Sequence, residues 1–258
     1  MNIVEIDNVQ LLICLIFVLF SGISSILLSL GLTKDIILGT IRTFGQLFIM
    51  GFILKYVFEI EKAYLVLLIF VGMILFSAFT IKGRIKEKKV TFFLPTFMSM
   101  LVSFMLVSIV VTVAVIQVKP WYEPRYFIPL GGMIIGNSMN AIAISLDRMF
   151  SEVKKRREEI ELYLSLGATY QEATSEIFIN SIRAGMIPTI NAMMTVGIVF
   201  IPGMMTGQIL AGVNPILSIK YQIVVMLMLS SSTAIGSIIV IYIVRKMCFT
   251  SAHQIKID

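Results

Sequence analysis

Long uninterrupted runs of apolar residues dominate the chain and determine its predicted architecture. An α-helix needs about 20 mostly apolar residues to cross the hydrocarbon core of a bilayer, because each residue advances the helix by about 1.5 Å. By that criterion the sequence predicts about seven membrane-spanning helices, near residues 9–31, 36–57, 63–81, 92–117, 127–146, 184–204 and 218–244. We therefore expect an all-α integral membrane protein with a single transmembrane domain over residues 1–258.

The sixth segment is the least regular. It belongs to an apolar run that continues to about residue 219 but is interrupted by Pro202-Gly203 and Asn214-Pro215. Such pairs mark turns. We expect a helix, a short irregular or re-entrant segment over 205–217, and then the last helix. Irregular backbone at membrane depth is stable only where it packs in protein or faces water.

Composition supports the membrane class. The chain is 58% hydrophobic and only 14% charged, whereas soluble domains carry about 25% charged residues. The net charge of +6 raises the possibility of a nucleic-acid partner, but the basic residues fall in loops between apolar segments, so no such partner is expected. The expected location is the inner (plasma) membrane, with lipid around a multi-pass protein. The two cysteines, at opposite ends of the chain, predict neither a disulfide framework nor a metal site.

Positive charge predicts the orientation, because cytoplasmic loops are enriched in lysine and arginine. Basic residues gather in three segments: Lys82–Lys89, Arg148–Arg157 and Arg245-Lys246. With seven spans, placing all three inside puts the N-terminus outside and the C-terminus in the cytoplasm. The acidic N-terminus agrees, as do Trp121, Tyr122 and Tyr126, which suit the outer interface. Span five is also rich in small residues, and Gly132 and Gly136 share a helical face suited to close helix packing.

The only sizeable polar region is residues 147–183. Good helix formers occupy about 150–166, with Glu152 four residues before Arg156, a favourable spacing for an ion pair. Gly167 falls where a helix would end in the left-handed conformation. Thr169 and Glu172 form the capping-box pattern that opens a second helix. The pattern predicts a cytoplasmic helix-glycine-helix elbow, followed by re-entry into the membrane at Pro188.

A stiff polar elbow is suited to receiving force from a soluble motor. The sequence contains no glycine-rich phosphate loop of the Walker type, so any ATP hydrolysis is expected in a partner chain. Permeases of ABC transporters have a coupling loop with the pattern Glu-Ala-Ala, three residues, then Gly, and a later proline. This sequence resembles it in Glu161 and Gly167, with Leu162 and Tyr163 in place of the two alanines.

A wider resemblance extends from about Asn8 to Lys246. The stretches GTIRTFGQL (39–47), GNSMNAIAISLDR (136–148), ELYLSLGAT (161–169) and PGMMTGQILAG (202–212) are similar to the FetB/YbbM family of ABC-transporter permease subunits. That resemblance implies iron export, with plant relatives linked to aluminium tolerance. It also implies a homodimer with two copies of a separate cytoplasmic ATPase, which holds the ATP and Mg, and no cofactor in this chain. The residues implied to couple to the ATPase are Glu161, Leu164, Gly167, Ala168, Thr169 and Glu172.

Polar side chains inside spans are costly and suggest a pathway or a polar contact between helices. The candidates for a substrate pathway are Arg42, Gln46, Asn137, Asn140, Asn191 and Thr195. Arg42 could instead reach the interface, and the amides could simply join helices. Met139, Met193 and Met194 are weak candidates for a soft metal ion, since thioethers favour Cu(I) but also fill cores. No carboxylate pair or histidine cluster lies within the spans.

Three other functions remain open on sequence. A permease for a small organic solute such as a nucleotide sugar would fit uncharged polar lining residues equally well. An ion-driven secondary transporter would be expected to show inverted repeats and buried acids, and neither is evident. An intramembrane enzyme is disfavoured, because the chain has no HExxH or Gly-x-Ser-x-Gly motif and no intramembrane aspartate pair. The direction of transport comes from the family resemblance alone.

Overall fold

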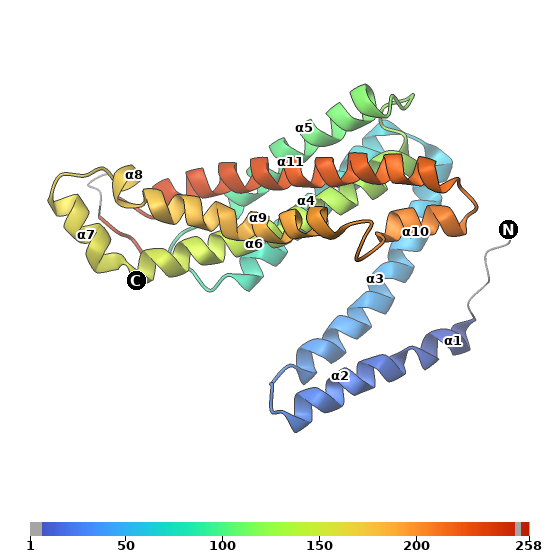
Figure 1. Ribbon diagram of the computed structural model, residues 1–258, viewed down its shortest axis with the longest axis horizontal. Helices are drawn as coiled ribbons and strands as arrows, with labels where there is room; N and C mark the ends of the chain where they lie inside the picture. The colour runs from blue at the N-terminus through green and yellow to red at the C-terminus, as the bar shows by residue number, and fades with distance from the viewer. Residues whose placement is uncertain (1–6, 251–253, 258) are drawn as a thin grey trace. The chain divides into compact units, whose positions relative to one another are not determined.

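The computed structural model describes residues 7–250 and 254–257, which are helical apart from short connections (Figure 1). The chain divides into two compact units, Met1–Glu61 with Leu210–Gly212, and Lys62–Ile209 with Val213–Asp258. Within the described residues, six helices are long and apolar enough to cross a membrane. The prediction of an all-α, multi-pass membrane protein is confirmed.

In its described residues, the first unit contains the helices α1 (Asn8–Ile13), α2 (Leu15–Leu27) and α3 (Thr33–Ile60). The predicted span 9–31 ends early, at Leu27, because a tight turn follows it. Ser29 and Gly31 have φ of 51° and 71° in that turn. The Ser25 hydroxyl accepts hydrogen bonds from the Leu32 backbone N–H and the Thr33 hydroxyl, both at 3.1 Å, which fixes the start of α3.

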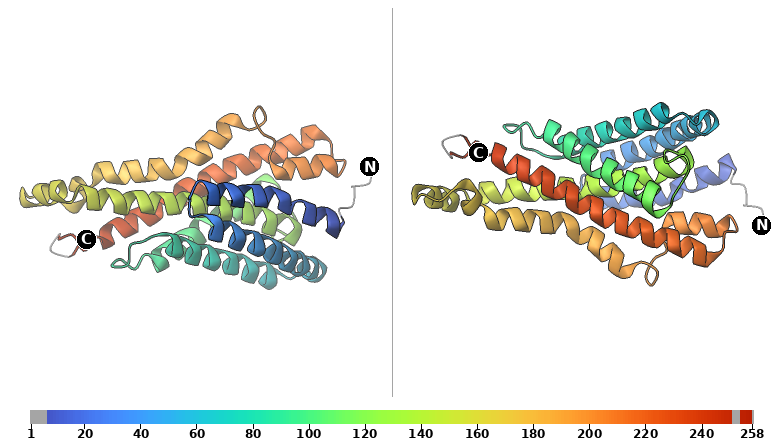
Figure 2. Two further views of the ribbon diagram at one scale, coloured as in Figure 1. Left: turned by 90° about the horizontal axis from the view of Figure 1, so that it is seen from below. Right: turned by 90° about the horizontal axis from the view of Figure 1, so that it is seen from above.

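The second unit is a bundle in which long helices lie side by side (Figure 2). The long helices are α4 (Ala63–Arg84), α5 (Phe93–Val110, continued by the π-helical turn η1, Val111–Val115), α6 (Pro124–Lys155), α9 (Ser175–Thr195) and α11 (Pro215–Met247). α6 contacts α4, α5, α9 and α11 and forms the centre of the core. Its apolar contacts include Phe127, whose ring lies 5.1 Å from that of Phe70 on α4.

Small residues on α6 and its neighbours permit close helix packing, but at only one of the two positions predicted. A Cβ added to Gly131 would lie 2.8 Å from Cδ2 of Phe70, so this glycine accommodates the ring. Gly132 meets only the tip of Met73, and Gly136 has open space around it. The predicted Gly132–Gly136 packing face is therefore wrong for Gly136. Buried hydroxyls join α6 to α11, where Ser138 lies 3.3 Å from Ser232 and 3.2 Å from Thr233.

The predicted sixth span over 184–204 is not a single helix. α9 starts earlier, at Ser175, and ends at Thr195, where Val196 becomes extended and Gly197 takes a φ of 82°. Pro188 lies inside α9, and the prediction that the chain re-enters the membrane there stays a prediction. A short helix, α10 (Gly203–Leu210), and a turn then lead to α11. Whether this segment is re-entrant stays a prediction.

α9 bears on the count of spans. Its 21 residues correspond to about 32 Å of helix, close to the thickness of a hydrocarbon core. It does not qualify by composition, because it contains Glu176, Arg183 and two asparagines. It nevertheless runs along α6 and α11 (Figures 1 and 2), so it would provide the seventh crossing. The count of seven and the orientation of the termini stay predictions.

The three basic segments meet at one end of the second unit. The Lys154 ammonium at the end of α6 lies 2.9 Å from the Glu87 carboxylate in the loop after α4. Arg245 at the end of α11 donates a 2.7 Å hydrogen bond to the Thr174 hydroxyl before α9. At the other end of the bundle, Tyr126 stacks on Tyr221. The predicted orientation, with all three basic segments on the cytoplasmic side, requires them to lie at one end of the bundle, as they do here.

Candidate functional site

The candidate site is the elbow between α6 and α9, formed by α7 (Arg157–Ser165), Gly167 and the short helix α8 (Tyr170–Ala173) (Figure 1). Gly167 has a φ of 92°, and its N–H donates to the Leu164 carbonyl at 3.1 Å. The Ala168 N–H donates to the Tyr163 carbonyl at 3.0 Å. These bonds satisfy the last carbonyls of α7. The predicted helix-glycine-helix bend is confirmed.

The capping box that opens α8 is also present. The Thr169 N–H donates to the Glu172 carboxylate at 2.8 Å, and the Glu172 N–H donates to the Thr169 hydroxyl at 3.3 Å. Hydrogen bonds from the backbone and hydroxyl of Thr169 lower the pKa of Glu172. The carboxylate is therefore ionised at neutral pH, and its hydrogen bonds with Thr169 cap the start of α8.

The arm entering the elbow differs from the predicted helix over 150–166. α6 continues without interruption to Lys155, and the break comes at Arg156. Glu152 does not pair with Arg156 as predicted, because it lies 3.2 Å from Arg148 instead. Arg156 is thereby available to the elbow.

Arg156 clamps the two arms of the elbow together. It forms two hydrogen bonds of 2.7 Å with Glu159 on α7 and one of 2.9 Å with Glu176 on α9. Hydrogen bonds to Glu159 and Glu176 raise the pKa of Arg156 above its ordinary value. Arg156 thus joins α7 to Glu176, a residue 20 positions further along the chain, and this link stiffens the bend.

The tip of the elbow presents apolar side chains to solvent. Leu166 is 76% exposed, Leu162 is 59% exposed and Tyr163 is 48% exposed. Glu161 is exposed beside them and pairs with Arg157 at 2.8 Å. Leu164 and Ala168 are half-buried. Exposed apolar groups within a lipid-facing span are expected, but on a charged elbow beyond the spans they indicate a surface for protein contact.

Arg245, which the sequence assigned only to orientation, fastens the elbow to the last helix. Besides its bond to Thr174, it donates to the Gln171 carbonyl. Its guanidinium carbon lies 5.0 Å from the centre of the Phe178 ring and 5.9 Å from that of Tyr170. The signal in the sequence was the position of an arginine at the end of a span, which does not reveal a partner 71 residues away.

We expect Arg245→Ala to leave the protein folded but to loosen the elbow. Charged hydrogen bonds contribute about 1.5–3 kcal/mol, so losing this anchor should raise amide hydrogen exchange over 170–178 by roughly 30-fold. Hydrogen exchange with mass spectrometry measures this directly, and exchange in α4 should stay unchanged. Equal protection of 170–178 in both proteins would contradict the anchoring role.

Glu87 ties the loop after α4 to the same end of the bundle. Burial opposes its ionisation, but hydrogen bonds from the Lys89 backbone and the Lys154 side chain outweigh burial and lower the pKa of Glu87 below its ordinary 4.5. A lowered pKa in the folded state adds stability above about pH 4.5, and this stability is lost as the pH falls through the lowered pKa.

We therefore expect Glu87→Gln to destabilise the protein at pH 7 by about 1–2 kcal/mol. As the pH falls through the lowered pKa, the difference in unfolding temperature between the variant and the native protein should shrink toward zero, because the native carboxyl becomes protonated. Thermal unfolding in detergent over a series of falling pH values measures this difference. A gap that persists unchanged at low pH would show that the charge of Glu87 is not its cause.

The predicted pathway residues of the second unit do not form one cluster. Asn137 donates to the Met133 carbonyl at 3.0 Å, and Asn140 accepts a 2.8 Å hydrogen bond from Arg84 at the end of α4. Both amides lie on an exposed side of α6. On α9, the Thr195 hydroxyl donates to the Asn191 carbonyl at 2.9 Å. Among the described residues, no hydrogen bond links the α6 pair to the α9 pair.

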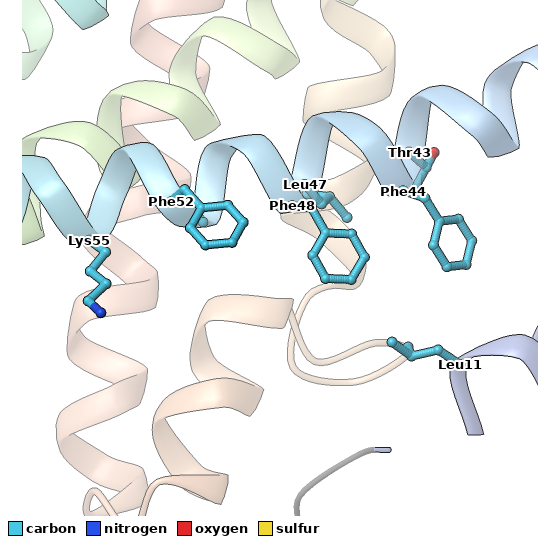
Figure 3. A pocket seen from close by; sticks show the side chains of 8 residues that line it. Leu11, Thr43, Phe44, Leu47, Phe48, Phe52 and Lys55 are labelled. Atoms are coloured by element: carbon cyan, nitrogen blue, oxygen red, sulfur yellow. The ribbon is translucent and has the colours of Figure 1, made fainter. Parts of the chain in front are cut away.

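Arg42 and Gln46 are exposed on α3 in the first unit. Beside them, Phe44, Phe48 and Phe52 point toward Leu11 across a pocket of about 560 Å³ (Figure 3). The pocket lining is almost entirely apolar, and neither Arg42 nor Gln46 belongs to it. Its polar lining residues are Thr43 and Lys55, which do not form a set of ligands for a metal cation.

The methionine candidates are separated. Met193 lines a cavity of about 320 Å³ with Met205, Met226 and the buried Gln222, but Met139 and Met194 do not line it. Within the described part of the chain, no three histidine, cysteine, aspartate or glutamate residues come together as metal ligands.

Comparison with known proteins places the chain in a family. The model of the family described as "Uncharacterised protein family (UPF0014)" matches residues 8–249. The chain is 34% identical to "Probable iron export permease protein FetB" of Escherichia coli over 100% of this chain and 98% of that protein. It is 35% identical to "UPF0014 membrane protein YjkA" of Bacillus subtilis, over 97% and 98% of the two chains.

A plant relative is similar as well. The chain is 30% identical to "Protein ALUMINUM SENSITIVE 3" of Arabidopsis thaliana, over 94% of this chain and 87% of that protein. No solved structure matches. The family match and the relatives both extend over nearly the whole chain, including the elbow and the helices that hold it. The protein therefore belongs to the UPF0014 family of multi-pass membrane proteins, which includes a probable iron export permease.

Proposed function

We propose that this protein is the permease subunit of an ABC exporter and that a separate cytoplasmic ATPase docks on the elbow. The observation that carries the proposal is the solvent-facing apolar tip formed by Leu162, Tyr163 and Leu166 on a stiff polar bend. Buried apolar and aromatic side chains surrounded by polar contacts are the usual anchors of a protein interface. The residues assigned to contact the ATPase are those of the tip together with Glu161, Leu164, Gly167, Ala168, Thr169 and Glu172.

The elbow is suited to transmit force because each of its joints is fixed. Arg156 joins α7 to α9, and Arg245 joins the start of α9 to α11. A push on the tip would therefore reach α6, α9 and α11 together. ATP and Mg would be bound by the ATPase, and two permease subunits would pair with two ATPase subunits.

Iron or another metal is the proposed cargo, and export the proposed direction. The name of the E. coli relative supports both. The dispersed amides and the lack of a multidentate cluster among the described residues suit a weakly held ion or a chelate rather than a tightly bound one. A small organic solute is the second candidate, because Asn137, Asn140 and Arg84 provide uncharged and cationic hydrogen-bonding groups on one side of α6.

The deciding experiment is reconstitution into proteoliposomes, with and without a stand-alone ABC ATPase subunit from the same organism. The proposal expects ATP-dependent movement of iron only when both proteins are present. Other divalent metals and a nucleotide sugar are tested in parallel as alternative cargoes. Pumping by the permease alone would overturn the ABC assignment. ATP-dependent movement of the sugar but of no metal would overturn the proposal that the cargo is a metal.

A further inference from the structure

A cavity at the end of the second unit away from the elbow is lined by methionines from three helices. Its volume is about 320 Å³, and it lies between α9, α10 and the first half of α11 (Figure 1). Met193 comes from α9, Met205 from α10 and Met226 from α11. Apart from Gln222, the other residues of the lining are apolar. The groups of this cavity that are able to bind a ligand are therefore the thioethers and one amide.

The break after α9 brings these side chains to one place. Gly197 takes a φ of 82°, which ends the course of α9 and lets the chain begin again as α10. Met205 thereby lines the same cavity as Met193. On α11, Gln222 and Met226 are about one helical turn apart, so they lie on one face, and both are buried. Methionine often fills cores, but these side chains surround an open volume rather than fill it.

Gln222 provides a second, independent observation that indicates a ligand. It is only 6% exposed, and its Oε1 has no hydrogen-bond partner among the residues that the structure describes. Leaving a buried acceptor unpaired is strongly unfavourable, and most buried polar atoms in native proteins are bound to something. Because Gln222 lines the cavity, a cation held there would satisfy this oxygen.

The chemistry of these ligands selects a class of ion. Thioether sulfur is a soft ligand that favours Cu(I), whereas carboxylates and water suit harder ions such as Mg²⁺ and Mn²⁺. Thioethers and amides carry no charge, so a bound ion keeps its full charge in apolar surroundings. The cost of moving an ion out of water rises steeply with its charge, which favours a monovalent ion.

From this geometry we infer that the cavity is a binding site for one soft monovalent cation, Cu(I) or Ag(I), held by Met193, Met205, Met226 and Gln222. The inference does not depend on the ATPase or on the proposed cargo. An ion held by all four residues would join α9, α10 and α11. Binding would therefore fasten α10, a short helix between two turns, to the last helix.

The test uses the purified full chain in detergent and silver nitrate in a chloride-free buffer. Every protein carries Cys14→Ser and Cys248→Ser, because thiols would otherwise bind silver. The buried Cys248 donates to the Val244 carbonyl, a bond that serine keeps. Isothermal titration calorimetry gives the affinity for Ag(I), with manganese nitrate as the hard-ion control. Hydrogen exchange with mass spectrometry follows α10.

The variants remove sulfur without changing the volume of the side chain. Leucine replaces methionine at little cost in packing, so the triple variant Met193→Leu/Met205→Leu/Met226→Leu tests the ligands and not the fold. Met205→Leu alone is a milder version, since α10 has no buried residue. Met194→Leu is the matched control, because Met194 is 73% exposed and does not line the cavity.

The protein is expected to bind one Ag(I) and no Mn(II), and Ag(I) should slow amide exchange in α10. The triple variant should lose affinity by at least the roughly 10- to 100-fold that follows loss of an outer partner of a metal ligand. Met205→Leu should lose part of the affinity, and Met194→Leu should lose none. Gln222→Leu should melt at a higher temperature without silver, because an unpaired buried oxygen is gone, but gain less from silver. Equal affinities in the triple variant and Met194→Leu would overturn the inference.

Discussion

Replacing Gly185 with alanine should force α6 and α9 apart and lower the free energy of unfolding by about 2–3 kcal/mol, in the range of core overpacking. A Cβ at this position would lie 2.5 Å from the Ala141 carbonyl oxygen and even closer to the Ser145 hydroxyl. The first of these obstacles is backbone, which does not move aside as a flexible side chain does. The two helices that carry the elbow would have to separate.

Thermal unfolding in detergent measures this effect, with an expected fall in melting temperature of roughly 5–10 °C. Gly72→Ala on α4 is the matched control, because nothing lies within 4 Å of its added Cβ. Alanine is the better helix former, so the control should be neutral or slightly stabilised. If Gly185→Ala and Gly72→Ala have the same melting temperature, α6 and α9 do not approach each other as closely as described.

The second large effect is expected at the elbow tip, where Leu166→Asp should abolish stimulation of the partner ATPase. Leu166 is 76% exposed, so the change removes little burial within this chain. In the proposed complex, however, it would place a charge in an apolar contact. A central interface residue commonly contributes 2 kcal/mol or more, which corresponds to about 30-fold weaker association.

ATPase activity of the reconstituted pair and co-purification of the two proteins measure the result. Leu166→Met keeps an apolar side chain of similar volume and should retain most of the activity. The melting temperature of the permease alone should be the same in both variants. Normal coupled activity of Leu166→Asp would show that the tip is not part of the ATPase interface.

The sequence predicted best what is decided locally. Gly167, Thr169 and Glu172 lie within six residues, and the backbone bonds that they form are set by their own conformations, so the bend could be predicted from the sequence. The residues that fix the bend were not predictable in this way. Arg156 bonds Glu176, 20 residues away, and Arg245 bonds Thr174, 71 residues away. Such partners depend on how the helices pack.

The same distinction explains the errors in the spans. Hydropathy located α4 and α5 well, because their apolar surfaces face lipid or core on every side. It misplaced α9, because tertiary contacts with α6 and α11 support a helix that contains Glu176 and Arg183. The pathway candidates shared predicted faces, but only the structure revealed that Asn140 is bonded to Arg84. Which face conducts cargo stays a prediction.

The unbroken course of α6 has a mechanical consequence. After Pro129 the helix continues to Lys155 with no further proline, a stretch of 26 residues or about 39 Å. A rod of that length, rocked by 5° about its elbow end, carries its opposite tip sideways by roughly 3 Å. That displacement is close to the diameter of a water molecule, so in the proposed complex a small rotation of α6 driven by the ATPase would suffice to open or close a water-sized passage at the far end of the helix.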